Sequence, residues 1–234
     1  MNILQIFANI GEEVLTFIEG IGALIVGNVP QSHPVYISVS PTVDNSLADT
    51  GIASGNPIND YSVYTASTIN VANAYQIANA IIHQYPKLSG VSPRLVATIA
   101  INESGGNSPT LNLKAQRYEP AFHDTYVPDK DKSYATSYGP MQILLQTAVE
   151  TYNAGFKDFG FPTPELLMEP VAGMYFGIAY IKRIMNWCQT HGIVASDAII
   201  VMSYNGGFGA NNSQTQQYYQ KYLANINVLD NALA

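Results

Sequence analysis

The sequence predicts an all-α fold, and three observations support this prediction. Apolar residues recur every three or four positions in several separate segments, which is the spacing of one buried helix face. Several of these segments begin with a helix-start signal, in which Ser or Thr precedes Pro or Asp. Strand-like alternation is brief, at Val35–Val39. We therefore expect helices throughout, with no more than a small β-hairpin within residues 105–136.

Residues 1–29 are predicted to form an amphipathic helix. Seven apolar residues follow an unbroken 4-3 spacing, which is an a/d heptad seam over three heptads: Ile3, Phe7, Ile10, Val14, Phe17, Ile21 and Leu24. The segment lacks the basic start of a signal peptide and the roughly 20 consecutive apolar residues of a membrane span. We therefore expect no transmembrane span and an assembly or docking helix at residues 3–25. Packing of this helix onto its own domain is the alternative.

The remaining chain divides into a tether and a main domain. Residues 30–66 are predicted to be the tether, because prolines alternate with Ser, Asn, Thr and Gly without a helical period. Residues 67–234 contain the periodic segments and are predicted to be the domain. Its helices are expected from a Ser67-Thr68 cap to Pro86, from Ser92-Pro93, Gly139-Pro140, Thr163-Pro164, Pro170 and Ser196-Asp197, and over Gln214–Ile226.

The composition argues against several classes of function. The net charge is −7, and residues 1–86 hold −6 of it because they contain no Lys or Arg, so nucleic acid is not an expected partner. A single cysteine, Cys188, excludes an intramolecular disulfide and a Cys-x-x-Cys metal site. The histidines lie far apart without ligand-like spacing: His33, His83, His123 and His191. We expect neither a cofactor nor a metal.

One acidic residue, Glu103, stands at the end of an apolar helical run. It lies four residues after Ile99 and should face the core with it, where burial raises the pKa of a carboxyl group. It also falls in the last helical turn, whose dipole disfavours another negative charge. Both effects favour a carboxyl group that keeps its proton near neutral pH, as a general acid requires. A helix-terminal Glu in a surface salt bridge is the alternative.

Two further motifs follow the Glu103–Ser104 pair. They are Ser137–Ile143 (SYGPMQI) and Ser203–Gly207 (SYNGG), in that order. Together the three motifs resemble the catalytic domain of soluble lytic transglycosylases and their goose-type lysozyme relatives, over roughly residues 67–228. The resemblance implies a lysozyme-like fold. It also implies cleavage of the β-1,4 bond between N-acetylmuramic acid and N-acetylglucosamine in peptidoglycan.

The resemblance implies roles for individual residues. Glu103 would be the catalytic acid and base, and the substrate-binding residues would include Ser104, Gly139, Met141, Gln142, Tyr204 and Asn205. Gln142 and the Met141 backbone would line the glycan groove. Tyr204 would hydrogen-bond the catalytic carboxyl, and Asn205 would hold an N-acetyl group. The structural alternatives are a polar residue near a helix start for Gln142 and a glycine-capped helix end for Tyr204 and Asn205.

The link between the first two motifs is longer than the transglycosylases lead us to expect, since Glu103 and Gly139 are 36 residues apart. Within it, Arg117–His123 (RYEPAFH) resembles a segment of certain phage-type N-acetylmuramidases. This second resemblance implies that Tyr118 binds substrate and that Glu119 is a second active-site carboxylate. A salt bridge with Arg117 is the alternative for Glu119.

Three functions stay open at this point. A lytic transglycosylase uses one Glu, which protonates the glycosidic oxygen and then accepts a proton from the sugar's own 6-hydroxyl as a 1,6-anhydro ring closes. A muramidase would hydrolyse the same bond with Glu103 and Glu119. A non-catalytic glycan-binding virion protein is the third possibility, and the intact Glu103 argues against it.

The architecture predicts where the protein acts. A heptad helix without an export signal, joined to a cell-wall enzyme, favours a virion-associated bacteriophage enzyme acting at the host cell wall or periplasm. The bacterial cell envelope is the alternative location. The expected partners are peptidoglycan glycan strands, together with virion proteins or further copies of the chain at residues 3–25.

Overall fold

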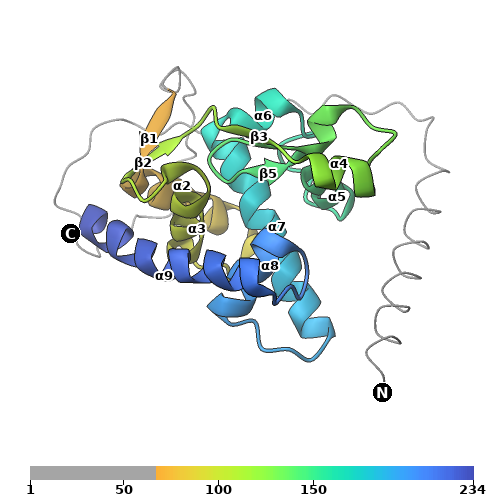
Figure 1. Ribbon diagram of the computed structural model, residues 1–234. Coiled ribbons are helices and arrows are strands. Elements are labelled where there is room, and N and C mark those ends of the chain that lie inside the picture. The colour runs from red at the N-terminus through yellow and green to blue at the C-terminus, as the bar shows by residue number, and fades with distance from the viewer. Residues whose placement is uncertain (1–66) are drawn as a thin grey trace. The chain divides into compact units, whose positions relative to one another are not determined.

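The computed structural model describes residues 67–234 (Figure 1). The predicted helix at residues 1–29 and the predicted tether at residues 30–66 lie outside the described residues. Within the described part, the fold is mainly helical with two small antiparallel sheets, as expected for a lysozyme-like domain. No helix there combines the length and the apolar character needed to cross a bilayer.

The helices occur in the order in which the sequence predicts them, with one short addition, α4. Their bounds are α2 (Val71–Gln84), α3 (Pro93–Ala100), α4 (Pro120–Tyr126), α5 (Leu145–Asn153), α6 (Pro164–Met168), α7 (Pro170–Thr190), α8 (Asp197–Gly206) and α9 (Ser213–Leu233). Shorter helical turns are η3 (Pro86–Leu88), η4 (Ile101–Gly105) and η5 (Lys132–Ala135). The strands are β1 (Thr68–Asn70), β2 (Thr110–Asn112), β3 (Gln116–Tyr118), β4 (Thr136–Tyr138) and β5 (Ile143–Leu144).

Three predicted helix starts are confirmed by their caps. The side chains of Ser92, Thr163 and Ser196 accept hydrogen bonds from the third backbone amide of α3, α6 and α8, respectively. These bonds satisfy amides that have no partner inside the helix. The long helix predicted from Pro170 is α7, and the predicted last helix is present but extends to Leu233.

The predicted cap at Ser67-Thr68 is wrong. Thr68 begins strand β1, which pairs antiparallel with β2 in the register Thr68↔Asn112, and the cap of α2 is Asn70. The Asn70 side chain accepts a bond of 2.7 Å from the amide of Asn73. Asn is as good a cap as Ser, so the local pattern did not distinguish the two starts.

The β structure within residues 105–136 is divided between two sheets. Strand β2 pairs with β1, which precedes α2, while β3 pairs with β4 and β4 pairs with β5. The expected small β-hairpin is present as the antiparallel pair β3–β4, which extends two residues beyond the segment, while β2 pairs with β1 from outside it. The order β3-β4-β5 places Arg117 opposite Ser137, so the long link between the first two motifs returns to the second one.

The predicted helix start at Gly139 is also wrong, because α5 begins at Leu145. Gly139 and Gln142 both have positive φ, 72° and 44°, which no helix accommodates. Gly139 is required here, since a Cβ would lie 2.0 Å from the Leu167 carbonyl oxygen. The segment is therefore a tight turn that leads into β5.

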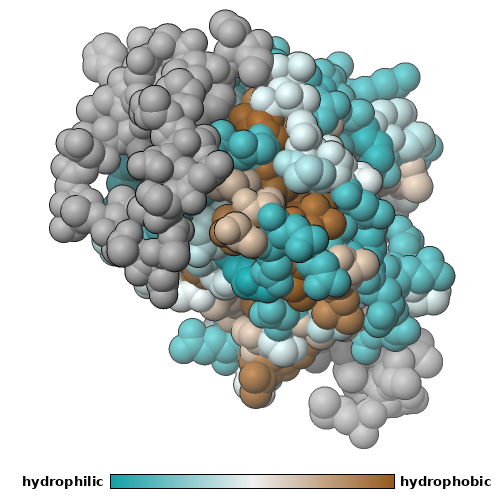
Figure 2. Space-filling view, turned by 90° about the vertical axis from the view of Figure 1, so that its left-hand side faces the viewer, coloured by the Kyte–Doolittle hydropathy of each residue, from teal (hydrophilic) through white to brown (hydrophobic). Residues whose placement is uncertain are grey.

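The core is built around α7, which runs through the middle of the domain (Figure 1) and contacts α2, α5, α6 and α8. Most of its residues from Pro170 to Ile181 are buried. Gly177 lets the second motif approach, because a Cβ there would lie 2.7–2.8 Å from the side chain of Met141. On the face shown in Figure 2, hydrophobic residues are scattered among hydrophilic ones.

Candidate active site

Glu103 lies in an unusual helical turn. Helix α3 widens at its end into the π-helix η4, and Gly106 closes the turn in the left-handed region with φ 57°. Single π turns are rare in helices, and those that occur are often found at functional sites. The predicted position of Glu103, at the end of an apolar helix, is thus confirmed, and its side chain is half-buried.

The carboxyl group of Glu103 has one hydrogen-bond donor from α9. The hydroxyl of Tyr218 donates to Oε1 of Glu103 at 2.6 Å. Burial raises the pKa of Glu103 from 4.5 to about 7, and the bond from Tyr218 lowers it in part. Burial also raises the pKa of Tyr218 well above its usual 10, so this hydroxyl remains a donor. Glu103 therefore exchanges its proton near neutral pH, as the sequence predicts.

Charged groups from two sides act on this carboxyl. Arg117 from β3 and Lys221 from α9 lower the pKa of Glu103, while Glu119 raises it. Tyr204 of α8 is also close enough for the charge of Glu103 to raise the pKa of its hydroxyl. The net result is a carboxyl group whose pKa is set by burial against partly compensating charges.

The three sequence motifs meet through two hydroxyl groups. Oγ of Ser104 donates to the carbonyl oxygen of Pro140 at 2.8 Å and also lies 3.2 Å from the carbonyl oxygen of Ala100. The hydroxyl of Tyr204 donates to the carbonyl oxygen of Met141 at 2.8 Å. The Pro140–Met141 backbone is thus bonded on one side to the Glu103 turn and on the other to α8.

Tyr204 does not make the contact that the resemblance implies. Its hydroxyl bonds the Met141 backbone, and the phenol that bonds Glu103 is Tyr218. Tyr218 was not among the predicted site residues. The only sequence signal for it is the Tyr-rich last helix, in which Tyr218, Tyr219 and Tyr222 are equivalent candidates.

The other residues of the second and third motifs shape the backbone. Nε2 of Gln142 donates to the carbonyl oxygens of Ala115 at 2.9 Å and Gly139 at 3.0 Å, so this amide is buried in its own turn. Asn205 is half-buried and makes no side-chain hydrogen bond to residues 67–234. Gly206 fits closely against α9, because a Cβ would lie 2.5 Å from Thr215. Asn205 thus remains available to a ligand, and the side-chain donors of Gln142 do not.

The predicted second carboxylate is in an ion pair. Nε of Arg117 bonds Oε1 of Glu119, and the side chain of Glu119 is 36% exposed. Tyr118, between them in sequence, is also exposed, and Nζ of Lys132 lies 5.6 Å from the centre of its ring. Neither Tyr118 nor Glu119 makes a hydrogen bond with Glu103.

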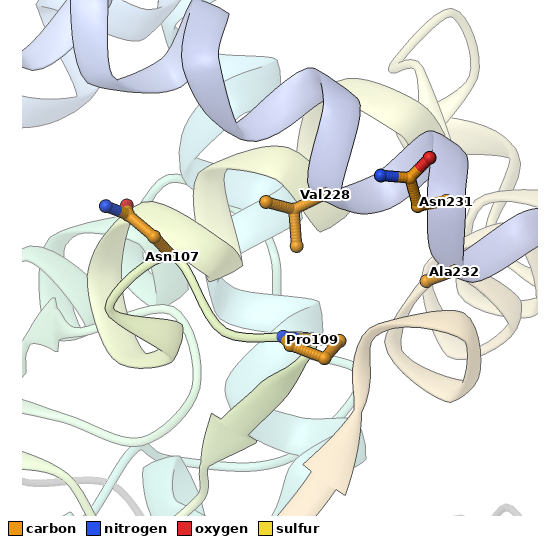
Figure 3. Close-up of a pocket in the computed structure, with 5 residues that line it drawn as sticks. All are labelled: Asn107, Pro109, Val228, Asn231 and Ala232. Carbon is orange, nitrogen blue, oxygen red and sulfur yellow. The ribbon is translucent and has the colours of Figure 1, made fainter.

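A separate pocket of about 330 Å³ lies beside the C-terminal part of α9 (Figure 3). The pocket is lined by Asn107, Pro109, Val228, Asn231 and Ala232. This lining contains no acidic residue and none of the groups that bond Glu103. This pocket is therefore separate from the hydrogen-bond partners of Glu103. Among the residues that the structure describes, no cluster of His, Cys, Asp and Glu has the arrangement of a metal site.

The family model for the transglycosylase SLT domain matches residues 80–227, which is more than half of the chain. The chain belongs to this family. No curated protein matches the chain. The matched SLT residues include Glu103, Tyr204 and Tyr218, together with the whole link between the first two motifs. As an SLT-domain protein, the chain is an enzyme of the lysozyme-like superfamily that acts on peptidoglycan.

Proposed function

We propose that this SLT-domain enzyme is a lytic transglycosylase in which Glu103 alone acts as acid and base. It cleaves the β-1,4 bond between N-acetylmuramic acid and N-acetylglucosamine and leaves a 1,6-anhydro end. The observation that supports this proposal is the half-buried Glu103, with its pKa of about 7 and its bond from Tyr218. The candidate for a second carboxylate, Glu119, is paired with Arg117.

The reaction follows from the state of this carboxyl group. Protonated Glu103 gives its proton to the glycosidic oxygen as the bond to the muramic acid C1 breaks. The resulting carboxylate is stabilised by the Tyr218 hydroxyl and by the positive charges of Arg117 and Lys221. It then accepts the proton of the 6-hydroxyl, whose oxygen bonds C1. Glu103 is protonated again at the end, and no water is consumed.

Product analysis tests this proposal directly. Full-length protein is incubated with purified peptidoglycan, and the released fragments are analysed by mass spectrometry. We expect 1,6-anhydro-muramic ends, which are one water lighter than the corresponding reducing ends. Fragments with reducing ends alone would contradict the transglycosylase mechanism and favour the muramidase.

A hydrolytic muramidase is the second candidate, because Glu119 is close enough to Glu103 to raise its pKa and is partly exposed. In that reaction Glu119 would have to leave Arg117 or share it while it positions a water molecule. If the enzyme uses water in this way, the wild type should release reducing-end products and the Glu119→Gln variant should be inactive.

We further propose that residues 3–25 form an assembly helix and that the enzyme works at a host cell wall as part of a virion. The support for assembly is the unbroken heptad seam, since an exposed apolar stripe of seven residues marks an interface. A chain starting near Tyr61 should be monomeric and active, while the full chain should self-associate or require a partner. Light scattering that finds the full chain monomeric and the shortened chain unfolded would contradict the assembly proposal.

A further inference from the structure

The turn that contains Glu103 is bonded to α9 by a second residue, Asn102. Its side-chain Oδ1 accepts a hydrogen bond from Nδ2 of Asn225 at 2.5 Å. Its side-chain Nδ2 donates to the backbone carbonyl oxygen of Tyr218 at 3.2 Å. Its own backbone carbonyl oxygen accepts a bond from Nζ of Lys221 at 2.7 Å. We call Asn102, Lys221 and Asn225 the α9 clamp.

The clamp lies on the same face of α9 as Tyr218. Lys221 and Asn225 follow Tyr218 by three and seven residues, which are positions along one helix face. One face of α9 therefore holds both the backbone next to Glu103 and the hydroxyl that bonds its carboxyl group. A shift of the turn relative to α9 would change both contacts together.

The burial of the two amides makes this arrangement specific. Asn102 is 5% exposed and Asn225 is 1% exposed, so neither can replace the other with water. A buried amide that loses its partner costs about 1–3 kcal/mol. Lys221, in contrast, lies on the exposed side of the clamp and binds a carbonyl oxygen of the rare π turn. Two residues of the clamp are thus buried, and the third, Lys221, is exposed and can be substituted without opening a cavity in the core.

We propose that Asn225 and Lys221 are positioning residues, which act through Asn102 to hold the Glu103 turn where Tyr218 can bond its carboxyl group. The proposal rests on the proposed function, because it takes Glu103 as the acid. Neither residue bonds Glu103 directly, so Asn225 acts on its placement alone, whereas Lys221 acts on its placement and also through its positive charge. Misplacement of a catalytic group by about 1 Å can cost 100-fold in rate.

Kinetics of full-length variants on purified peptidoglycan test the proposal. Asn225→Ala should lower kcat roughly 10- to 100-fold and leave KM within about twofold. Asn227→Ala is the matched control, because Asn227 is an exposed amide on the same helix with no side-chain hydrogen bond to residues 67–234. The double variant Asn102→Ala/Asn225→Ala should lose no more activity than Asn102→Ala alone, because both changes remove the same contact.

Lys221 provides a test that does not depend on a buried residue. Lys221→Met should lower kcat without lowering the melting temperature, and Lys221→Arg should restore activity. Lys221→Gln, which keeps a donor for the carbonyl oxygen but not the positive charge, should be more active than Lys221→Met if the donor positions the turn. Wild-type kcat in both Lys221→Met and folded Asn225→Ala would overturn the proposal. Should Asn225→Ala fail to fold, wild-type kcat in Lys221→Met alone would overturn it.

A titration separates failure of the clamp from failure of the proposed function. The carboxyl carbon of Glu103 is followed by ¹³C NMR, and the pKa of Glu103 should rise in Asn225→Ala, because a displaced turn weakens the Tyr218 bond and the Lys221 charge that both lower this pKa. The groups that face Glu103 are Tyr218 and Lys221 of α9, Arg117 and Glu119, and Tyr204 of α8, and of these the clamp holds Tyr218 and Lys221 in register with the turn. An unchanged pKa would overturn the clamp, whether or not the wild type releases anhydro products.

Discussion

Glu103 and Glu119 are two carboxylates of the candidate active-site region, and they differ in the charge of the group that bonds them. Glu103 is half-buried at the end of α3 and receives a neutral phenol from α9. Glu119 is 36% exposed at the start of α4 and is paired with a guanidinium group. Burial favours the protonated form of Glu103, whereas Glu119 makes an ion pair at the surface. The same residue type is thus prepared for proton donation at one position and is held in an ion pair at the other.

The largest expected effect comes from removing the proton of Glu103. Glu103→Gln keeps the shape and the bond from Tyr218 but cannot donate a proton, so activity on cell walls should fall about 100- to 10,000-fold. Clearing of a turbid cell-wall suspension measures it. Glu165→Gln is the control, since Glu165 is an exposed carboxylate on α6. Near wild-type clearing by Glu103→Gln would contradict the assignment.

The same substitution should stabilise the fold above neutral pH. The folded protein holds the Glu103 proton up to a pKa of about 7, whereas the unfolded chain releases it near 4.5. Ionisation therefore favours the unfolded chain increasingly between pH 4.5 and 7, and the penalty stays constant above pH 7. We expect Glu103→Gln to be more stable than the wild type by up to about 3 kcal/mol at pH 8 and equal to it below pH 4. Urea unfolding at the two pH values would show no such difference if Glu103 were an ordinary surface carboxylate.

Loss of the phenol should have a smaller effect with a defined sign. The Tyr218 bond lowers the pKa of Glu103, so Tyr218→Phe should raise it and move the alkaline limb of the rate profile to higher pH. Activity at the optimum should fall roughly 10-fold, because a hydrogen bond to a charged group is lost. Tyr219→Phe is the control, since that hydroxyl has no hydrogen-bond partner within residues 67–234. An unmoved alkaline limb would mean that Tyr218 does not contact the catalytic carboxyl group in solution.

The smallest expected effect belongs to Glu119. Glu119→Gln removes the pairing with Arg117 and a charge that raises the pKa of Glu103, so the alkaline limb should move slightly to lower pH. Most of the activity and all of the anhydro product should remain. Asp124→Asn removes an exposed carboxylate from the same helix, α4, and is the control. An inactive Glu119→Gln enzyme would remove the contrast between the two carboxylates and support the muramidase.

Local signals in the sequence were sufficient for most helices and for Glu103. Caps at Ser92, Thr163 and Ser196 depend on bonds within one helical turn, and the burial of Glu103 follows from its register with Ile99. The helix start predicted at Gly139 failed because the apolar period of α5 was extended backward over a turn with positive φ. Sequence spacing does not show such backbone angles directly.

The contact of Tyr218 with Glu103 could not be predicted from the sequence for a different reason. It joins residues 115 positions apart, and three tyrosines on one helix cannot be ranked without knowing how that helix packs. Asn102 was missed for the same reason, since its partner Asn225 is 123 positions away. The burial of Glu103 could be predicted from its neighbours in sequence, and the contacts that Tyr218 and Asn225 make across the fold could not.

The distance along the chain between Glu103 and Tyr218 also has a consequence for synthesis. Of the described helices, α9 is the last to leave the ribosome, and it supplies the phenol, the ammonium group and the amide that complete the surroundings of Glu103. A nascent chain therefore contains its acid long before it contains the partners of that acid. An enzyme that degrades cell walls would in this way become active only after α9 has been made and has docked.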